Sequence, residues 1–337
     1  MKDIINWGIL GLGRIAGEFA GCLRYLPDAR IAAAGSRDIE KAREFCKIYG
    51  GKPYGSYEEL VNDPDVDIIY IATLHHQHEE HTKLALRAGK HVLCEKPMAV
   101  NEASAARMYS EAEKHNLFLM DGLWSRFFPA WEFAKQIIDS GELGNIVAIN
   151  SLTSWGAFPV EPENRLFNLD LAGGALLDGG IYSLAAISVI LGADEYPSSI
   201  KALTEIGSTK VDEHDGVILQ FPSGVICTVL CGLQGALQIT NVLCESGTLT
   251  VPVHRNPRNV EVRSRNPYAP NFRSALFKDY MFPYEDEGFQ FEAAHVHDCL
   301  KKGLTESPRV TKKESLMLLR IADEIRRQAG FVYPFEK

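Results

Sequence analysis

The chain has 337 residues, of which 46% are hydrophobic and 23% charged, an ordinary globular composition with length enough for two domains. Its formal net charge of −9 excludes a broad nucleic-acid-binding surface, which needs clustered lysine and arginine. The N-terminal residues lack the basic region and apolar run of a secretory signal, and no apolar run is long enough to span a membrane. Seven cysteines without close pair spacing favour a reducing compartment. We therefore expect a cytoplasmic protein with no nucleic-acid or membrane partner.

The first third of the chain alternates short apolar runs with amphipathic segments. Strand-like runs occur at 4–10, 29–36, 66–73, 91–94 and 117–120, and helical patterns at 15–23, 39–49, 77–88 and 101–115. The third run, VDIIYIAT, is almost continuously apolar, which is typical of a strand covered on both faces. This alternation predicts a doubly wound parallel sheet, an α/β domain over residues 1–121.

The pattern changes beyond residue 121. After a helical segment at 130–140, strand-like runs occur at 146–153, 200–205, 216–221, 225–230 and 247–253, with helical patterns at 180–191 and 312–327. The residues Pro222-Ser223-Gly224 indicate a hairpin turn between two of these runs, and the segment 255–271, rich in Arg, Asn and Pro, indicates a long excursion. Segregated strands predict a second, α+β domain over residues 122–337 with a largely antiparallel sheet.

A glycine pattern follows the first predicted strand. The stretch GILGLGRIA places Gly11, Gly13 and Ala16 in a G-x-G-x-x-A spacing at a strand-to-helix turn. In such a turn the first glycine allows the tight bend, the second lets a pyrophosphate approach the backbone, and the small third residue allows close helix packing. The alternative is a plain glycine-rich turn. The strand–turn–helix context favours dinucleotide binding.

The end of the second predicted strand bears on the choice of dinucleotide. An acid at this place would bind the ribose 2′-hydroxyl of NAD, but here the sequence is Ser36-Arg37-Asp38. Arg37 can pair with a 2′-phosphate through charge-assisted hydrogen bonds, which favours NADP. Two alternatives stay open: Arg37 is a solvated surface residue, or Asp38 reaches the ribose and NAD is used.

Four histidines lie within seven residues of LHHQHEEH, which follows the third strand-like run. A zincin helix needs H-E-x-x-H, whereas His78 and His81 are three residues apart, so we predict no metal site. Ligands of open α/β sheets bind beyond the carboxyl ends of the strands. His75 or His78 is therefore expected to line a cofactor cleft, with exposed histidines at a helix start as the alternative.

Two further stretches carry candidate proton-transfer groups. In HVLCEKPM a lysine, Lys96, stands where a buried strand ends, and Pro97 biases it toward extended backbone. In GGALLDGGIY, Asp178 and Tyr182 are four residues apart and can share one face of a helix. A nearby ammonium would stabilise a tyrosinate and lower the phenol pKa. The alternatives are that Asp178 caps the helix and Tyr182 is a core aromatic.

The same stretches, together with SRD, HVLCEKPMAVN and LWSRFFP, carry a family resemblance. The chain resembles the glucose–fructose oxidoreductase / inositol dehydrogenase / MocA family over essentially its whole length. LWSRFFP and GGALLDGGIY resemble more particularly the dimeric dihydrodiol dehydrogenase branch, which also oxidises D-xylose with NADP. The resemblance implies an N-terminal Rossmann domain, an open-faced C-terminal sheet and a homodimer formed through that sheet.

The resemblance also implies roles for particular residues. The catalytic residues are Lys96, Asp178 and Tyr182, with Tyr182 where many relatives have a histidine. The cofactor-binding residues are Gly11, Gly13, Arg14, Ile15, Ser36, Arg37, Thr73, His75, His78, Glu95 and Lys96. The substrate-binding residues are Trp124, Arg126, Phe158 and Phe282. Asp121 stands where relatives often carry glutamate.

The function implied is an NADP-dependent oxidoreductase acting on an aldose or an aromatic trans-dihydrodiol, with NAD as the alternative cofactor. Two other interpretations stay open. One is a related reductase of a keto- or anhydro-sugar, because one active site catalyses both directions. The other is a non-catalytic NADP-binding sensor, against which the presence of both Lys96 and Tyr182 argues.

Overall fold

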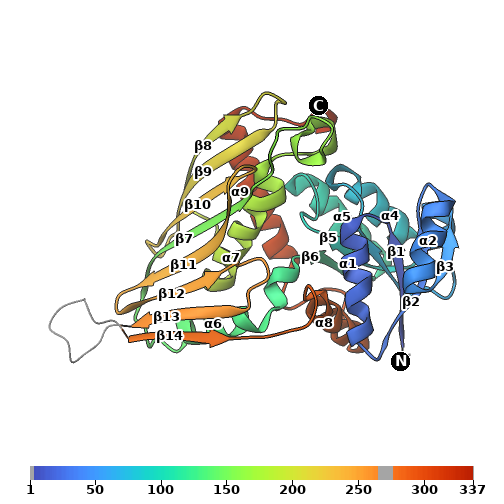
Figure 1. Ribbon diagram of the computed structural model, residues 1–337, viewed down its shortest axis with the longest axis horizontal. Helices are drawn as coiled ribbons and strands as arrows, with labels where there is room; N and C mark the ends of the chain where they lie inside the picture. Colours follow the sequence, from blue (N-terminus) through green and yellow to red (C-terminus); the bar gives the residue numbers. More distant parts are fainter. Residues whose placement is uncertain (1–3, 265–275, 337) are drawn as a thin grey trace. The chain divides into compact units, whose positions relative to one another are not determined.

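The computed structural model describes residues 4–264 and 276–336 (Figure 1). The chain folds into two compact units, and each is described by itself. Unit 1 comprises residues 1–124 and 286–316, and unit 2 comprises residues 125–285 and 317–337.

Unit 1 is built on a six-stranded parallel sheet with the strand order β3-β2-β1-β4-β5-β6. Its strands are β1 (Ile5–Leu10), β2 (Ala29–Gly35), β3 (Lys52–Tyr54), β4 (Ile68–Ile71), β5 (His91–Glu95) and β6 (Leu119–Gly122). Its connecting helices are α1 (Arg14–Cys22), α2 (Ile39–Tyr49), α3 (Tyr57–Val61), α4 (His78–Arg87) and α5 (Glu102–His115). The strand order reverses between β1 and β4, so the prediction of a doubly wound sheet is confirmed.

Side-chain caps begin three of these helices. Asp38 caps α2, Ser56 caps α3 and Asn101 caps α5, each by accepting a backbone N–H of the first turn. By contrast, α1 begins at Gly13, which has no side chain to accept such a bond. The first N–H groups of α1 are therefore left without a side-chain cap.

A segment distant in sequence completes unit 1. Helix α8 (Phe289–Lys301) packs against α1: the rings of Phe19 and Phe289 meet edge to face with centroids 6.1 Å apart. His297 Nε2 on α8 also accepts a hydrogen bond of 2.9 Å from the indole N–H of Trp7 on β1. The division by contacts thus differs from the predicted 1–121 and 122–337 in placing residues 286–316 with unit 1. A helix that docks on a distant part of the chain has the same local pattern as any other amphipathic helix.

Unit 2 is built on an eight-stranded sheet with the order β14-β13-β12-β11-β7-β10-β9-β8. Its strands are β7 (Ile146–Trp155), β8 (Ser199–Ile206), β9 (Asp212–Gln220), β10 (Ile226–Gly232), β11 (Ala236–Cys244), β12 (Gly247–Pro252), β13 (Asn259–Ser264) and β14 (Leu276–Met281). Neighbouring strands are antiparallel except for the central pair β7–β10, which is parallel. The predicted α+β fold with a largely antiparallel sheet is confirmed, and β9 and β10 form the predicted hairpin.

The segment 255–271 was expected to be a long excursion, and this was wrong for residues 259–264, which form β13. Residues 265–271 lie outside the described part of the chain. Strand β14 lacks an apolar alternation because it is an edge strand, with five of its six residues exposed.

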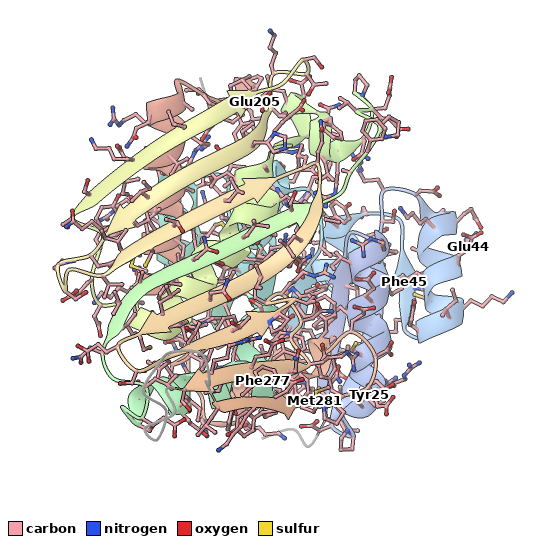
Figure 2. All side chains as sticks on the ribbon, turned by 60° about the vertical axis from the view of Figure 1, so that its left-hand side comes forward. Tyr25, Glu44, Phe45, Glu205, Phe277 and Met281 are labelled. Carbon is pink, nitrogen blue, oxygen red and sulfur yellow. The ribbon has the colours of Figure 1, made fainter. Side chains whose placement is uncertain are left out.

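The two faces of the unit 2 sheet differ. Helices α6 (Pro129–Asp139) and α7 (Ile181–Leu191) pack on one face. Figure 2 looks onto the other face, where no helix of the described residues covers the strands. The exposed apolar side chains that the strand register places on this face are Leu203, Ile218, Ile226, Leu230, Leu237, Leu243, Phe277 and Met281. Among the described residues, one helical stretch, Leu169–Leu191, is long and apolar enough to cross a membrane, but 89% of it is buried, as in a core helix.

Candidate active site

The turn between β1 and α1 is built around two glycines with different roles. Gly11 has φ +88°, and a Cβ there would lie 2.7 Å from Thr73 Cγ2 and 3.0 Å from the carbonyl oxygen of Ala72. At Gly13 no protein atom lies within 4 Å of an added Cβ. Gly11 is therefore required by the fold, whereas Gly13 leaves open space at the uncapped start of α1. An anion such as a pyrophosphate fits this space, since the free N–H groups and the helix dipole favour negative charge.

Arg14 and Ile15 form the first turn of α1, where both were predicted to contact a cofactor. Arg14 is exposed and pairs with Glu18 one turn later. Thr73, at the end of β4, hydrogen-bonds through its hydroxyl to His81 Nδ1 at 3.0 Å. These residues lie around the carboxyl ends of β1 and β4, where the strand order reverses.

The end of β2 carries the residues expected to distinguish the two dinucleotides. Asp38 caps α2 by accepting the N–H of Glu40 at 3.0 Å, so its carboxylate already has a role in the fold. The Ser36 hydroxyl accepts the N–H of Asp38 at 3.2 Å. Burial raises the pKa of the Tyr57 phenol, and the positive charge of the nearby Arg37 guanidinium acts in the opposite direction. The sequence patterns missed Tyr57, because a tyrosine at the start of a short helix carries no signal for this contact.

The histidine segment is mainly structural in the described geometry. His78 is fully buried, with Nδ1 at 2.9 Å from the carbonyl oxygen of Pro97 and Nε2 at 3.1 Å from that of Thr73. Burial lowers the pKa values of His78 and His81 to about 4, so both imidazoles are neutral at neutral pH. A neutral imidazole carries a single N–H, so His78 donates to only one of these two carbonyl oxygens, while its ring lies between the end of β4 and the loop after β5. His75, only partly buried, has its ring centroid 5.8 Å from that of His78, and the cofactor role of both stays a prediction.

Lys96 follows the last residue of β5 and is 9% exposed. Its backbone N–H donates to Glu95 Oε2 at 3.1 Å, and the hydroxyl of Tyr70 donates to Glu95 Oε1. Burial raises the pKa of Glu95 to about 7, although the charge of Lys96 acts in the opposite direction. The lysine is thus placed on a strand end whose neighbouring carboxyl is partly ionised near neutral pH.

The residues predicted for the substrate belong to both units. In unit 1, Trp124 is 2% exposed and stacks on Phe289 with centroids 4.2 Å apart. In unit 2, Phe158 is 81% exposed, and the Phe282 ring lies 5.3 Å from Phe133. Arg126 is half-buried in unit 2, in the short helix that begins at Trp124. The substrate role of these four residues stays a prediction.

Asp178 and Tyr182 lie at the start of one continuous helical segment. Asp178 is in a π-helical turn, η6 (Leu176–Gly180), and Tyr182 is the second residue of α7. Neither helix start has a side-chain cap, so Asp178 does not serve as one. Its Oδ1 instead accepts a hydrogen bond of 3.0 Å from the guanidinium of Arg165. A π-helical turn is uncommon and often marks a functional position.

Residues that the sequence patterns missed surround Tyr182 within unit 2. The ring of Trp155 meets that of Tyr182 edge to face, with centroids 6.0 Å apart, and the guanidinium of Arg255 lies 5.4 Å from the Trp155 ring. A Cβ on Gly179 would lie 2.9 Å from Trp155 Nε1, so the indole packs directly on the π-helical turn. Spacing along the chain gives no signal for these contacts, because β7 and η6 meet only through the tertiary fold.

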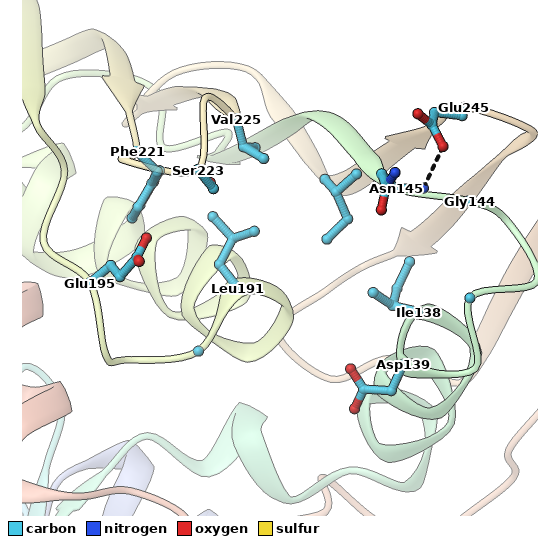
Figure 3. Close-up of a pocket in the computed structure, with 13 residues that line it drawn as sticks. Ile138, Asp139, Gly144, Asn145, Leu191, Glu195, Phe221, Ser223, Val225 and Glu245 are labelled. Atoms are coloured by element: carbon cyan, nitrogen blue, oxygen red, sulfur yellow. Dashed lines mark hydrogen bonds between the residues drawn. The ribbon is translucent and has the colours of Figure 1, made fainter.

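A cavity of about 860 Å³ in unit 2 lies elsewhere (Figure 3). It is lined by the ends of α6 and α7, the β9–β10 hairpin and the β11–β12 turn, and includes Asp139, Glu195 and Glu245. Glu245 accepts the N–H of Asn145 at 2.9 Å. None of the residues predicted for the site lines this cavity.

Comparison with known proteins decides the family. Residues 5–123 match the family described as "Oxidoreductase family, NAD-binding Rossmann fold", and residues 131–250 match the "GFO/IDH/MocA C-terminal domain". The chain belongs to the Gfo/Idh/MocA family. It is therefore an NAD(P)-dependent oxidoreductase, and the resemblance noted from its motifs is confirmed.

Members of this family with curated functions match over the whole chain. The protein is 38% identical to trans-1,2-dihydrobenzene-1,2-diol dehydrogenase of Bos taurus, with 99% of each chain covered, and 36% identical to that of Homo sapiens, again with 99% of each covered. Among solved structures, the aldose-aldose oxidoreductase of Caulobacter crescentus in complex with glycerol has a TM-score of 0.86 and 27% identity, covering 97% of this chain and 98% of its own. KijD10, a 3-ketoreductase from Actinomadura kijaniata in complex with NADP and TDP-benzene, has a TM-score of 0.84 and 25% identity, covering 96% and 97%.

Proposed function

We propose that this protein is an NADP-dependent dehydrogenase that transfers hydride between the nicotinamide and a hydroxyl-bearing carbon of an aldose, such as D-xylose, or of a trans-dihydrodiol. The observation that carries the proposal is the end-to-end similarity to trans-dihydrodiol dehydrogenases in a chain that has Lys96 at the end of β5 and Tyr182 at the start of α7. The similarity to an aldose-aldose oxidoreductase supports the sugar alternative.

NADP is the proposed cofactor because of the residues at the end of β2. Arg37 supplies a guanidinium for a 2′-phosphate, while the Asp38 carboxylate is used as a helix cap. The open space at Gly13 suits the pyrophosphate. KijD10, of similar fold, was solved with NADP. NAD remains the alternative cofactor.

In the proposed mechanism the protein handles the proton and the developing charge. NADP, when bound, supplies the hydride acceptor. Tyr182 accepts the proton of the substrate hydroxyl, and Lys96 stabilises negative charge on the reacting oxygen or on the tyrosinate. Asp178, held by Arg165, orients the substrate or the lysine rather than accepting the proton, since an ordinary carboxylate is far too weak a base for a sugar hydroxyl.

The proposal includes two alternative functions and a second copy of the chain as partner. A reductase of a keto- or anhydro-sugar is the alternative activity, favoured by the similarity to a 3-ketoreductase. A non-catalytic NADP-binding sensor is the alternative from another class. The open apolar face of the unit 2 sheet suits a homodimer formed through it, in a cytoplasmic protein.

The test is a turnover assay of the purified protein with NADP and NAD against a panel of aldoses, trans-dihydrodiols and keto-sugars. We expect turnover with NADP, and a fall in kcat by about 10²–10⁴ in Tyr182→Phe, the range for losing a general base. The Tyr182→Phe variant should bind NADP as the parent does, and Lys96→Met should lower kcat at least as far. Binding of NADP without turnover on any substrate would support the sensor instead. Full activity of Tyr182→Phe with an unchanged pH profile would assign the base to another residue.

A further inference from the structure

Two buried carboxyls lie side by side on one strand of unit 2. Asp212 and Asp215 on β9 are 2% and 1% exposed. The pairing of β8 with β9 shifts register here, because Ile206 pairs with Asp212 and Glu205 with His214, which leaves Glu213 as an extra residue. Such a bulge re-aims the side chains beside it. It allows two residues three apart on a strand, which would normally point to opposite faces, to meet.

Each carboxyl also holds a different part of unit 2. Asp212 Oδ2 accepts the backbone N–H of Leu176 at 2.7 Å, and Leu176 is the first residue of η6. Asp215 Oδ1 accepts the hydroxyl of Thr204 at 2.6 Å, and its Oδ2 accepts the thiol of Cys231 at 3.4 Å. The remaining oxygen, Asp212 Oδ1, is buried and has no other hydrogen-bond donor among the described residues.

The charges of this pair require a proton. The bulge brings both carboxyls to the buried side of β9, and no lysine or arginine in the described part of the chain forms an ion pair with either. Two neighbouring carboxylates in a buried site do not both ionise at neutral pH, because like charges repel and neither is hydrated. A proton held between them supplies the missing donor to Asp212 Oδ1.

The pair lies directly against the segment that carries Asp178 and Tyr182. A Cβ on Gly174 would come within 2.0 Å of Asp212 Oδ1, and a Cβ on Gly180 within 2.9 Å of Cys231 Sγ. Gly174 and Leu176 are therefore packed on Asp212, and Gly180 is packed on Cys231, whose thiol donates to Asp215. A separation of the two carboxyls would break the bond to Leu176 and displace this segment.

We propose that Asp212 and Asp215 share one proton and act as positioning residues for Asp178 and Tyr182. The proposal rests on the proposed function for the role of those two residues. At alkaline pH the pair loses the shared proton to a base in the solvent. The two carboxylates then repel each other, and η6 shifts. The oxidation of an alcohol releases a proton and is therefore faster at alkaline pH. Loss of the shared proton would lower the activity above a certain pH, so the pair would set an upper pH limit for the reaction.

The groups around the pair favour its protonated form at neutral pH. Burial and mutual repulsion raise the pKa of Asp212 well above its usual range, and burial raises the pKa of Asp215. The other titratable groups facing the pair are His214 on β9, which lowers the Asp215 pKa, Cys231 on β10, and Tyr333 near the C-terminus. The pKa values of Cys231 and Tyr333 are themselves raised well above the usual range, chiefly by burial, so neither group adds negative charge at neutral pH.

The test uses Asp215→Asn, whose amide donates to Asp212 Oδ1 without titrating. The melting temperature and kcat/KM of the full chain are measured from neutral to alkaline pH for the parent, the variant and Asp139→Asn, a control at an exposed acid of the same unit. The folded pair holds a proton that the unfolded chain releases, so the parent should lose stability progressively as pH rises. The variant should lose less stability than the parent and retain kcat/KM at an alkaline pH where the parent's has fallen; the control should follow the parent.

The outcomes separate this inference from the proposed function. Identical pH dependence of melting in Asp215→Asn and the parent would overturn the shared proton. A shifted melting profile with an unshifted kcat/KM profile would overturn the positioning role. If the parent shows no turnover, the proposed function fails while the melting profile still decides the shared proton. Should Asp215→Asn not fold, Asp212→Asn tests the same pair, since its amide oxygen still accepts Leu176 and its NH₂ donates to Asp215.

Discussion

The two glycines of the β1–α1 turn allow the fold and the cofactor site to be tested separately. In Gly13→Ala the new methyl group meets no protein atom within 4 Å, and φ at this position is −86°, which alanine adopts without strain. In Gly11→Ala the methyl lies 2.7 Å from Thr73 Cγ2 and the backbone stays at φ +88°. The left-handed backbone alone costs about 1–2 kcal/mol for a residue with a Cβ. The contact with Thr73 adds overpacking, commonly about 1–3 kcal/mol.

The expected results therefore have opposite patterns. Gly11→Ala should lower the free energy of unfolding by about 2–5 kcal/mol from strain and overpacking together, equivalent to several degrees or more in the melting temperature. Gly13→Ala should melt as the parent does. Its NADP affinity should nevertheless fall by about 10- to 100-fold, the cost of one weakened charge-assisted contact of about 1.5–3 kcal/mol with the pyrophosphate.

Thermal melting without cofactor and fluorescence titration with NADPH measure the two quantities. The parent protein is the reference for both, and each variant serves as the control for the other. Parent-like NADPH affinity in Gly13→Ala would refute dinucleotide binding at this turn. Loss of stability in Gly13→Ala would show that the space beside Gly13 is used by the fold.

Three other predictions concern the cofactor, acid stability and assembly. Replacing Arg37 by alanine should weaken NADP binding by about 2–3 kcal/mol and barely change NAD binding, as titrations with both cofactors would show; equal weakening would mean that Arg37 does not contact the phosphate. Burial lowers the pKa of His254 to about 4, so the neutral form is favoured in the folded state, and stability should fall by up to about 3 kcal/mol as pH drops from about 6.5 toward about 4. His254→Gln should show a smaller acid-side fall in melting temperature than the parent or His115→Gln, and an unchanged fall would contradict this. The parent should sediment as a dimer at micromolar concentration, and lysine at both Ile218 and Leu230 should shift it toward monomer, whereas Ile48→Lys in unit 1 should not; a monomeric parent would exclude the open sheet face as an interface.

The fold was largely predictable because its signals are local. The apolar run ending at Ile71, the glycine turn at Gly11 and the capping residue Asn101 each report on a few neighbouring positions. The Pro222-Ser223-Gly224 turn fixed the β9–β10 hairpin for the same reason. Local patterns did not predict features that depend on tertiary packing. Helix α8 packs on α1 through Phe289, and the edge strand β14 has little apolar alternation.

The candidate site was predictable at the level of motifs and not at the level of contacts. Gly11, Gly13, Arg37, Lys96 and Tyr182 follow from stretches that each carry their own chemical reason. The contact of Arg37 with Tyr57, and the contact of Asp178 with Arg165, join separate segments of the chain. Local sequence carries no information on such pairs. The same holds for the shared-proton pair on β9, which depends on a bulge in the pairing with β8.

The parallel pairing at the centre of the unit 2 sheet bears on how this unit forms. Strand β10 pairs with β7 from Ile226 opposite Ala148, so two adjacent central strands are joined by a long crossover that contains η6, α7, β8 and β9. Closing so long a loop lowers the chain entropy before the stabilising contacts between β7 and β10 have formed. This raises the barrier to folding and slows it. The segment with Asp178 and Tyr182 belongs to that crossover. Recovery of activity after dilution from denaturant should therefore follow the consolidation of this sheet, later than the recovery of helical signal.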